Sequence, residues 1–156
     1  MVINMKNRIV YVNRQEADAV KAEAMQKENV FFAELDGRFI QTEADYVREM
    51  ELVMDCRYEK SDTYWKLGWY FDWICELLWL GEKDVVLLIR SYDRMLSDDE
   101  KTKRRIIEDF EERTLPWWEG EVVGHMVGGK PRSFMVYLEG KALSACLHEK
   151  TEGARQ

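Results

Sequence analysis

Short apolar runs along the chain alternate with longer stretches in which apolar and charged residues mix. Four of these runs have strand length and carry the β-branched or aromatic residues that are typical of strands. The run DVVLLI is apolar almost throughout, as in a strand that is buried on both faces of a sheet. The predicted strands are residues 8–12, 30–35, 84–89 and 133–138, and an Asp36-Gly37 turn closes the second of them.

Segments with helical character separate these strands. Thr42 stands where an N-cap belongs, with Asp45 three residues on, and apolar positions at helical spacing follow. Ser97 and Glu100 form a capping box for a later helix, which we expect Pro116 to help stop. The predicted helices are residues 14–26 (rich in Ala, Glu, Lys and Met), 42–54, 64–80, and 97 to about 113.

Strands that alternate with helices need crossover connections, so we expect an α/β fold: a small, mainly parallel β-sheet packed with helices. The glycine-rich residues 124–130 match the first seven positions of a phosphate-binding P-loop. However, Pro131 stands where a magnesium-binding Ser or Thr belongs, and a strand follows instead of a helix. We interpret the segment as a turn that joins residues 121–123 to the last strand in a C-terminal hairpin insertion.

The chain has 156 residues and a formal net charge of −7, from 30 acidic and 23 basic side chains. This length suits one domain with a core of its own, which we place at residues 1–140, followed by a short tail at 141–156. The acidic balance argues against nucleic acid or an anionic membrane as a partner, because both require a positive face. A basic partner, or no charged partner, is favoured.

Neither targeting signals nor metal-site spacing is evident in the sequence. The first dozen residues lack a signal-peptide core, and no apolar run approaches the length of a membrane span. The cysteines Cys56, Cys75 and Cys146 are widely spaced, and the two histidines are far apart. This pattern contains no zinc motif. We therefore expect a reduced, cytoplasmic protein without metal or cofactor.

The segment over residues 64–80 is the most informative, because four of the six tryptophans lie in it. By three- and four-residue spacing, one stripe of the predicted helix carries Trp65, Trp69, Asp72, Glu76 and Trp79. Exposed indoles beside exposed carboxylates are typical of a protein-binding hot spot. Two alternatives remain open: an aromatic core with two solvated acids, or a carboxylate pair that performs acid/base catalysis.

The same segment resembles the barstar family of intracellular ribonuclease inhibitors, whose second helix carries Gly-x-Asn-Leu-Asp-x-x-x-Asp. Here Gly68 matches the glycine, Asp72 the first acid, and Glu76 takes the place of the second. A further inhibitory acid of the family lies in a Phe-x-Glu motif, which Phe110 and Glu112 match. The resemblance covers about residues 31–138, with the first strand and helix, residues 122–131 and the tail as additions.

The resemblance implies a non-enzymatic immunity protein, a monomer that blocks a basic ribonuclease or nuclease toxin in a 1:1 complex. Its carboxylates take the place of RNA phosphates in the active site of the enzyme. Two departures concern the identity of the target: Tyr70 replaces the family's Asn, and Cys75 replaces a contacting Trp. The implied partner-binding residues are Gly68, Trp65, Trp69, Tyr70, Asp72, Cys75, Glu76, Trp79 and Glu112.

Overall fold

The computed structural model of the protein describes residues 6–56 and 65–140. Within them, one sheet contains β1 (Ile9–Val12), β2 (Val30–Asp36), β3 (Asp84–Arg90) and β4 (Phe134–Glu139). The α-helices are α1 (Arg14–Met25), α2 (Glu43–Val53), α3 (Leu67–Trp73), α4 (Glu100–Asp109) and α5 (Val122–His125). Short 3-10 helices are η1 (Gly37–Phe39), η2 (Leu78–Leu80) and η3 (Tyr92–Arg94), and two π-helical segments are η4 (Phe110–Thr114) and η5 (Trp117–Glu121).

The four strands are all parallel and have the spatial order β1-β4-β3-β2. The α/β class and the mainly parallel sheet are therefore confirmed. β1 lies beside β4, with Ile9 opposite Val136, so the first strand is a full member of the sheet. The expected hairpin is wrong, because residues 121–125 are helical and β4 pairs only in parallel among the described residues.

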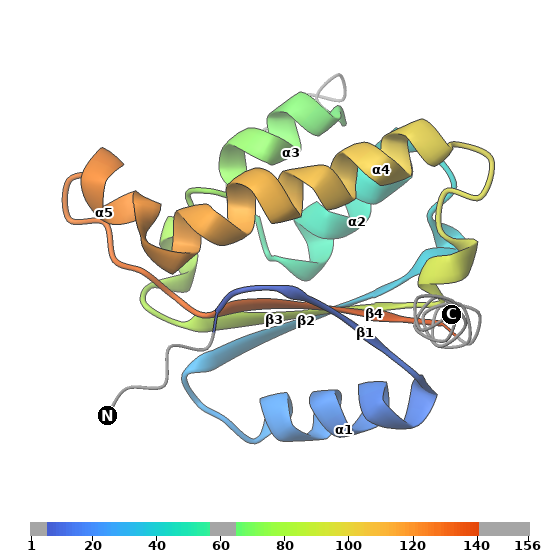
Figure 1. Ribbon diagram of the computed structural model, residues 1–156, viewed down its shortest axis with the longest axis horizontal. Coiled ribbons are helices and arrows are strands. Elements are labelled where there is room, and N and C mark those ends of the chain that lie inside the picture. Colours follow the sequence, from blue (N-terminus) through green and yellow to red (C-terminus); the bar gives the residue numbers. More distant parts are fainter. Residues whose placement is uncertain (1–5, 57–64, 141–156) are drawn as a thin grey trace, which may run out of the picture.

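Helices cover the two faces of the sheet unequally (Figure 1). α1 lies on one face, while α2, α3 and α4 lie on the other. Because successive side chains of a strand point to opposite faces, β3 contributes Leu87 and Ile89 to the larger core under α2–α4. Its residue Leu88 points the other way and packs with Val12 and Ala17 in the smaller core under α1. The site described below lies on the side of the larger core.

Side-chain caps determine where the helices begin. α2 begins at the predicted capping box, in which Thr42 Oγ1 accepts a hydrogen bond from Asp45 N at 3.1 Å. α4 is capped by Asp99, whose Oδ1 accepts from Thr102 N at 3.1 Å. Ser97 was therefore the wrong cap for this helix: it lies three residues before its first turn, whereas Asp99 is directly adjacent to it.

The helix predicted over residues 64–80 is much shorter in the structure. α3 ends at Trp73, the chain turns, and Leu77 adopts left-handed backbone geometry with φ of 45° before η2 begins. Such a conformation costs a non-glycine residue about 1–2 kcal/mol, which the complete burial of the Leu77 side chain offsets. As a consequence, Asp72 and Glu76 do not lie one turn apart on a continuous helix. Residue 64 and the tail from 141 lie outside the described residues.

Residues 100–125 form one helical run that passes through Pro116 instead of stopping there. Four residues of an α-helix turn about 400°, so each four-residue step drifts about 40° around the axis. The wider turns of η4 and η5 reverse this drift, and side chains four residues apart therefore stay on one buried face. These side chains are Thr102, Ile106, Phe110, Thr114, Trp118 and Val122.

Residues 126–130 of the glycine-rich segment form a turn before β4, whereas Gly124 and His125 still belong to α5. α5 ends at His125, before most of the segment, so no helix begins where a P-loop would require one. A Cβ atom on Gly129 would lie 2.6 Å from the carbonyl oxygen of Val122, so this glycine permits close packing. The Lys130 ammonium pairs with the carboxylate of Glu82.

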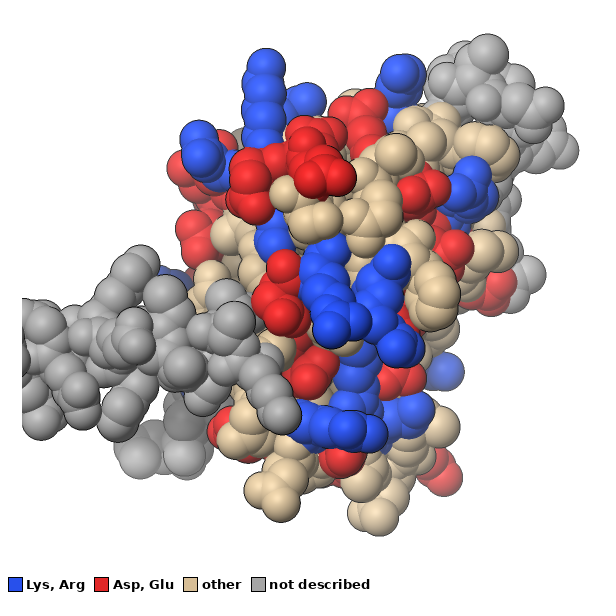
Figure 2. Space-filling view, turned by 90° about the vertical axis from the view of Figure 1, so that its right-hand side faces the viewer, with Lys and Arg blue, Asp and Glu red and all other residues tan. Residues whose placement is uncertain are grey.

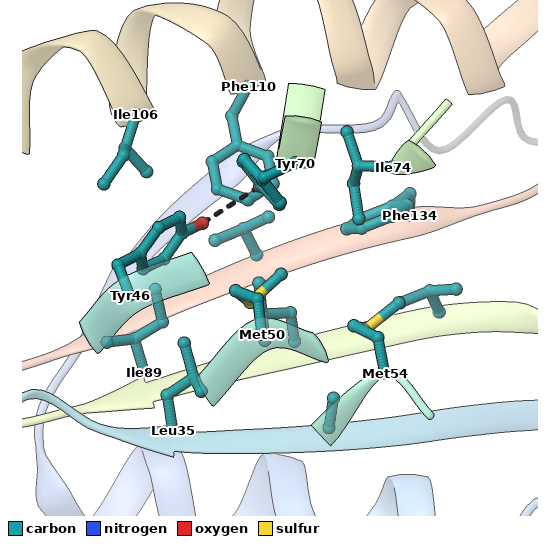
Figure 3. Close-up of a cluster of buried hydrophobic side chains, with 14 of the residues drawn as sticks. Leu35, Tyr46, Met50, Met54, Tyr70, Ile74, Ile89, Ile106, Phe110 and Phe134 are labelled. Atoms are coloured by element: carbon teal, nitrogen blue, oxygen red, sulfur yellow. Dashed lines mark hydrogen bonds between the residues drawn. The ribbon is translucent and has the colours of Figure 1, made fainter. Parts of the chain in front are cut away.

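Tyr46 on α2 and Tyr70 on α3 meet in the centre of the larger core (Figure 3). The Tyr46 hydroxyl donates to the Tyr70 hydroxyl at 2.9 Å, and the two rings meet edge to face with centroids 5.1 Å apart. Complete burial raises the pKa of both phenols above the usual range. This contact sets the position of α3 against α2, and thereby the position of the residues that α3 carries.

We predict that Tyr70→Phe lowers the free energy of unfolding by about 1–3 kcal/mol, because it leaves the buried Tyr46 hydroxyl without its acceptor. Urea denaturation measures the change. Tyr11→Phe, at an exposed position, is the control and should change stability by less than about 0.5 kcal/mol. Adding Tyr46→Phe to Tyr70→Phe should recover part of the loss; two single variants whose losses simply add would contradict a shared hydrogen bond.

Candidate partner-binding face

Three carboxylates singled out by the sequence form what we name the acidic face: Asp72, Glu76 and Glu112. Asp72 lies near the end of α3 and is exposed. Glu76 lies in the turn after α3 and is half-buried, and Glu112 is exposed on η4. The three therefore come from two elements that are 36 residues or more apart in the sequence, and contacts between these elements determine whether they form one surface.

Arg113 on η4 supplies these contacts. Its Nη2 donates to the carbonyl oxygen of Phe71, and its Nη1 lies 3.3 Å from Cys75 Sγ. Its Nε donates to Asp109 Oδ1 at 2.6 Å, and the Asp109 side chain is only 8% exposed. We name this group the Arg113 anchor.

The anchor is connected to the three acids of the acidic face through the backbone. Asp72 directly follows Phe71, Glu76 directly follows Cys75, and Glu112 directly precedes Arg113. Each acid is thus one residue from a member of the anchor. The backbone positions next to Asp72, Glu76 and Glu112 are therefore joined by one arginine, which links the end of α3 to η4.

The contacts of the anchor also terminate α3. The last four carbonyl groups of a helix lack partners within it, and a cation at this end is favourable. Arg113 satisfies the carbonyl of Phe71, and the indole N–H of Trp118 donates to the carbonyl of Ile74 at 3.0 Å. Side chains of the 100–125 helical run therefore hold the end of α3 at which Asp72 and Glu76 lie.

Cations are present within the face as well as acids. The guanidinium of Arg113 lies 5.4 Å from the centroid of the Phe71 ring, and that of Arg105 lies 6.0 Å from it. Sequence reasoning missed the role of Arg113, although Asp109 and Arg113 have the i,i+4 spacing of a helical ion pair. Arg105 also lies 3.9 Å from the carboxylate of Glu43 on α2.

The tryptophans that frame the face are half-buried and fixed by hydrogen bonds. The indole N–H of Trp69 donates to Glu51 Oε1 at 2.9 Å, and that of Trp65 donates to Glu51 Oε2 at 3.1 Å. Glu51 is only 3% exposed. This carboxylate on α2 was not among the predicted site residues, yet it orients two of the three indoles.

The third indole lies at the end of α2. Trp79 Nε1 donates to the carbonyl of Met54 at 2.8 Å and leaves part of its ring accessible. Its neighbour Leu78 is 68% exposed. The tryptophans predicted at the surface are thus half-buried: part of each ring is accessible, and each indole N–H donates a hydrogen bond within the protein.

Two predicted site residues lie in the core instead of on the surface. Tyr70 is completely buried against Tyr46, and Cys75 is buried beside the anchor. Burial raises the pKa of the Cys75 thiol to about 11, against the opposing effect of Arg113. Gly68 is exposed, and a Cβ atom there would meet nothing within 4 Å. Packing therefore does not require a glycine at this position.

Residues 6–56 and 65–140 offer no group of three or more His, Cys, Asp or Glu side chains placed to hold a metal ion. Across the same ranges, no helix combines the length and the apolar character needed to cross a bilayer. Comparison of the chain with protein-family models, with curated proteins and with solved structures gave no match. The chemistry of the face is therefore the guide to its partner.

We predict that Glu51→Gln destabilises the protein by about 1–3 kcal/mol, because an amide cannot accept from two indoles without turning its own N–H groups toward one of them. Tryptophan fluorescence in the native state should shift to longer wavelength as the rings lose their fixed positions. Glu49→Gln on the same helix is the matched control. Equal stability of the two variants would show that the Glu51 carboxylate does not hold the indoles.

We predict that Arg113→Lys loosens the end of α3, because an ammonium group lacks the planar fork that reaches three acceptors at once. Amide hydrogen exchange at residues 73–77 should accelerate about tenfold, while exchange in β3 stays unchanged. Arg104→Lys, at an exposed position of α4, serves as the control. Unchanged exchange at residues 73–77 in Arg113→Lys would show that Arg113 does not stabilise the end of α3.

Proposed function

We propose that the protein is an intracellular inhibitor of a basic ribonuclease or related nuclease toxin, a barstar-like immunity protein without enzymatic activity. The observation that carries the proposal is the Arg113 anchor, which joins the end of α3 to η4 and whose members Phe71, Cys75 and Arg113 are the chain neighbours of Asp72, Glu76 and Glu112. These are the three acids that the register with the barstar family selects.

The order of elements supports the proposal. β2 leads through η1 into α2 and α3, β3 follows beside β2, and β4 follows beside β3 after the long helical run. The resemblance to the family rests on the same order, a strand-turn-helix opening followed by two further strands. Agreement of topology with motif register favours an inhibitor over an unrelated use of exposed acids.

The face suits a binding site that is built for phosphates. Ribonucleases hold RNA through cationic side chains, and carboxylates at the positions of phosphates pair with Arg, Lys and protonated His in charge-assisted hydrogen bonds. The partly exposed rings of Trp69 and Trp79 would cover these pairs and exclude water, which strengthens them. Inhibition needs no turnover, since the carboxylates simply occupy the site.

Net charge supports the same partner. A formal charge of −7 attracts a basic enzyme over distances longer than a contact and raises the association rate at low salt. The cations Arg105 and Arg113 beside Phe71 add a second requirement. The surface of the partner should present acceptors next to its cationic pocket, so net charge alone does not define the target.

A catalytic role for Asp72 and Glu76 is the weaker alternative. α3 ends between the two residues, so they lack the one-turn spacing that a shared helix would give them. The two hollows at the amino and carboxyl ends of the strands are lined by other residues. Asp72 is exposed, as a binding residue should be and as a general acid in a closed site is not.

We predict that Asp72→Asn, Glu76→Gln and Glu112→Gln each weaken inhibition of a barnase-type ribonuclease at least about tenfold, because each removes one partner of a charge pair worth about 2–5 kcal/mol when buried. Ribonuclease assays and surface plasmon resonance measure inhibition and rates. Glu28→Gln, remote from the face and with the same change of charge, is the control.

Two outcomes would overturn the proposal. One is a triple variant that folds normally and inhibits as well as the wild type. The other is a wild-type protein that binds none of the barnase-type ribonucleases tested, including any nuclease encoded beside it.

A further inference from the structure

A hollow of about 610 Å³ lies at the carboxyl ends of the parallel strands. From the carboxyl ends of the strands, β1 leads to α1 on one face of the sheet, whereas β2 leads to α2 on the other face (Figure 1). Ligands of open α/β sheets usually bind outside the carboxyl ends of the strands. We name this hollow the carboxyl-end crevice. The acidic face does not share any of its lining residues.

Three guanidinium groups from three elements line the crevice. Arg14 comes from the first turn of α1, Arg38 from η1 after β2, and Arg90 from the end of β3. Figure 2 faces this end of the molecule and shows Lys and Arg side chains gathered in a column, with acidic side chains on both sides. Three arginines thus meet in one hollow, which carboxylates also line.

Carboxylates hold two of these arginines in place and leave part of each fork available. Arg38 donates through Nε and Nη2 to Asp36, at 3.1 and 2.6 Å. Arg90 uses Nε for Glu34 at 2.9 Å and Nη1 for Asp18 at 2.8 Å. Arg38 Nη1 and Arg90 Nη2 have no hydrogen-bond partner among the described residues. Because a guanidinium has five N–H donors, both arginines are oriented in advance and can still donate.

Arg14 is the arginine of the crevice that has no carboxylate partner among the described residues. The exposed Arg14 side chain makes no hydrogen bond or ion pair with any residue in the described part of the chain. The lining holds four carboxylates, those of Asp18, Glu34, Asp36 and Glu139, against three arginines. Arg38 and Arg90 are paired, Lys21 shares Glu34 at 2.9 Å, and the fourth acid, Glu139, accepts from the backbone N–H of Ser91 at 2.7 Å. Arg14 is therefore the natural first contact for an anion.

The rim of the crevice is closely packed. A Cβ atom on Gly37 would lie 2.4 Å from the carbonyl oxygen of Ser91, and one on Gly140 would lie 2.7 Å from Asp93 Oδ1. Both glycines therefore let the ends of β2 and β4 pack directly against the segment after β3. Ser91 itself has left-handed backbone geometry with φ of 50°. Backbone strain of this kind is concentrated at ligand sites, where the surrounding structure maintains it.

We propose that the carboxyl-end crevice binds a small oxyanionic ligand, a phosphorylated or polycarboxylate compound. Arg14 supplies a guanidinium that no described carboxylate pairs with, and the free N–H groups of Arg38 and Arg90 donate to the oxygens of the ligand. The volume of about 610 Å³ lies within the usual range of small-molecule sites. The site does not rest on the proposed inhibitory function, because the two use different residues.

Isothermal titration calorimetry at low salt tests the site with pyrophosphate and with citrate as separate probes. We expect saturable 1:1 binding of at least one probe to the wild type, with amide chemical shifts moving at Gly37 and Ser91. Arg14→Ala should weaken binding about tenfold. Arg104→Ala, which removes an equally exposed arginine from α4, should change it less than twofold. Pyrophosphate binding alone assigns phosphorylated ligands, and citrate binding alone assigns polycarboxylates.

Three results would overturn the site. The first is no binding of either probe up to about 10 mM, a concentration at which a dissociation constant of about 1 mM would already give near-saturation. The second is equal weakening by Arg14→Ala and Arg104→Ala, which would mean attraction by general surface charge. The third is binding without chemical-shift changes at Gly37 or Ser91. Loss of ribonuclease inhibition in Asp72→Asn with intact pyrophosphate binding separates the two functions.

Discussion

The guanidinium of Arg113 connects two elements that the sequence places far apart, and the position of the acidic face depends on this contact. A seven-residue helix such as α3 is too short to be stable alone, since isolated helices need about 12–15 residues even in favourable sequences. α3 is stabilised by the hydrogen bond from Tyr46 to Tyr70 in the core, and Arg113 and Trp118 satisfy carbonyl groups at its end. A half-exposed arginine thus has a structural role that a buried hydrophobic residue could not perform, because it satisfies backbone oxygens at the surface.

Strands, and the helices that begin at local caps, were predictable from the sequence because their signals are local. Thr42 and Asp45 satisfy each other within one turn, and the DVVLLI run needs burial on both faces wherever it occurs. The length of α3 was not predictable. Its apolar periodicity continues past residue 73, but the left-handed turn at Leu77 depends on where that side chain finds a buried space. Only the packed structure provides that information.

The candidate site shows the same division. Asp72 was identified correctly as an exposed acid, whereas Glu76, which was expected to be exposed with it, is half-buried; Glu112 was selected by the family register alone and is exposed. Glu51 was not identified, because a glutamate on an amphipathic helix is expected in water, and its burial against two indoles depends on α3. The buried repeat of four residues from Thr102 to Val122 was present in the sequence. It implies wide turns and a helical run through Pro116, since an α-helix would rotate such a repeat away from the core.

Charge is distributed unevenly over this fold. In the carboxyl-end crevice, three arginines and four carboxylates line a small volume, and Lys21 pairs with one of these carboxylates, so the crevice accounts for little of the overall charge of −7. The excess of acid must therefore lie elsewhere, and part of it lies exposed on α3 and η4.

This arrangement separates two kinds of attraction. A basic protein approaching in solution is drawn to the excess of acid, whereas a small anion is repelled by the molecule as a whole and gains only from close contact with oriented guanidinium groups. Added salt should weaken the first interaction through screening and affect the second less, because short hydrogen-bonded contacts are screened little.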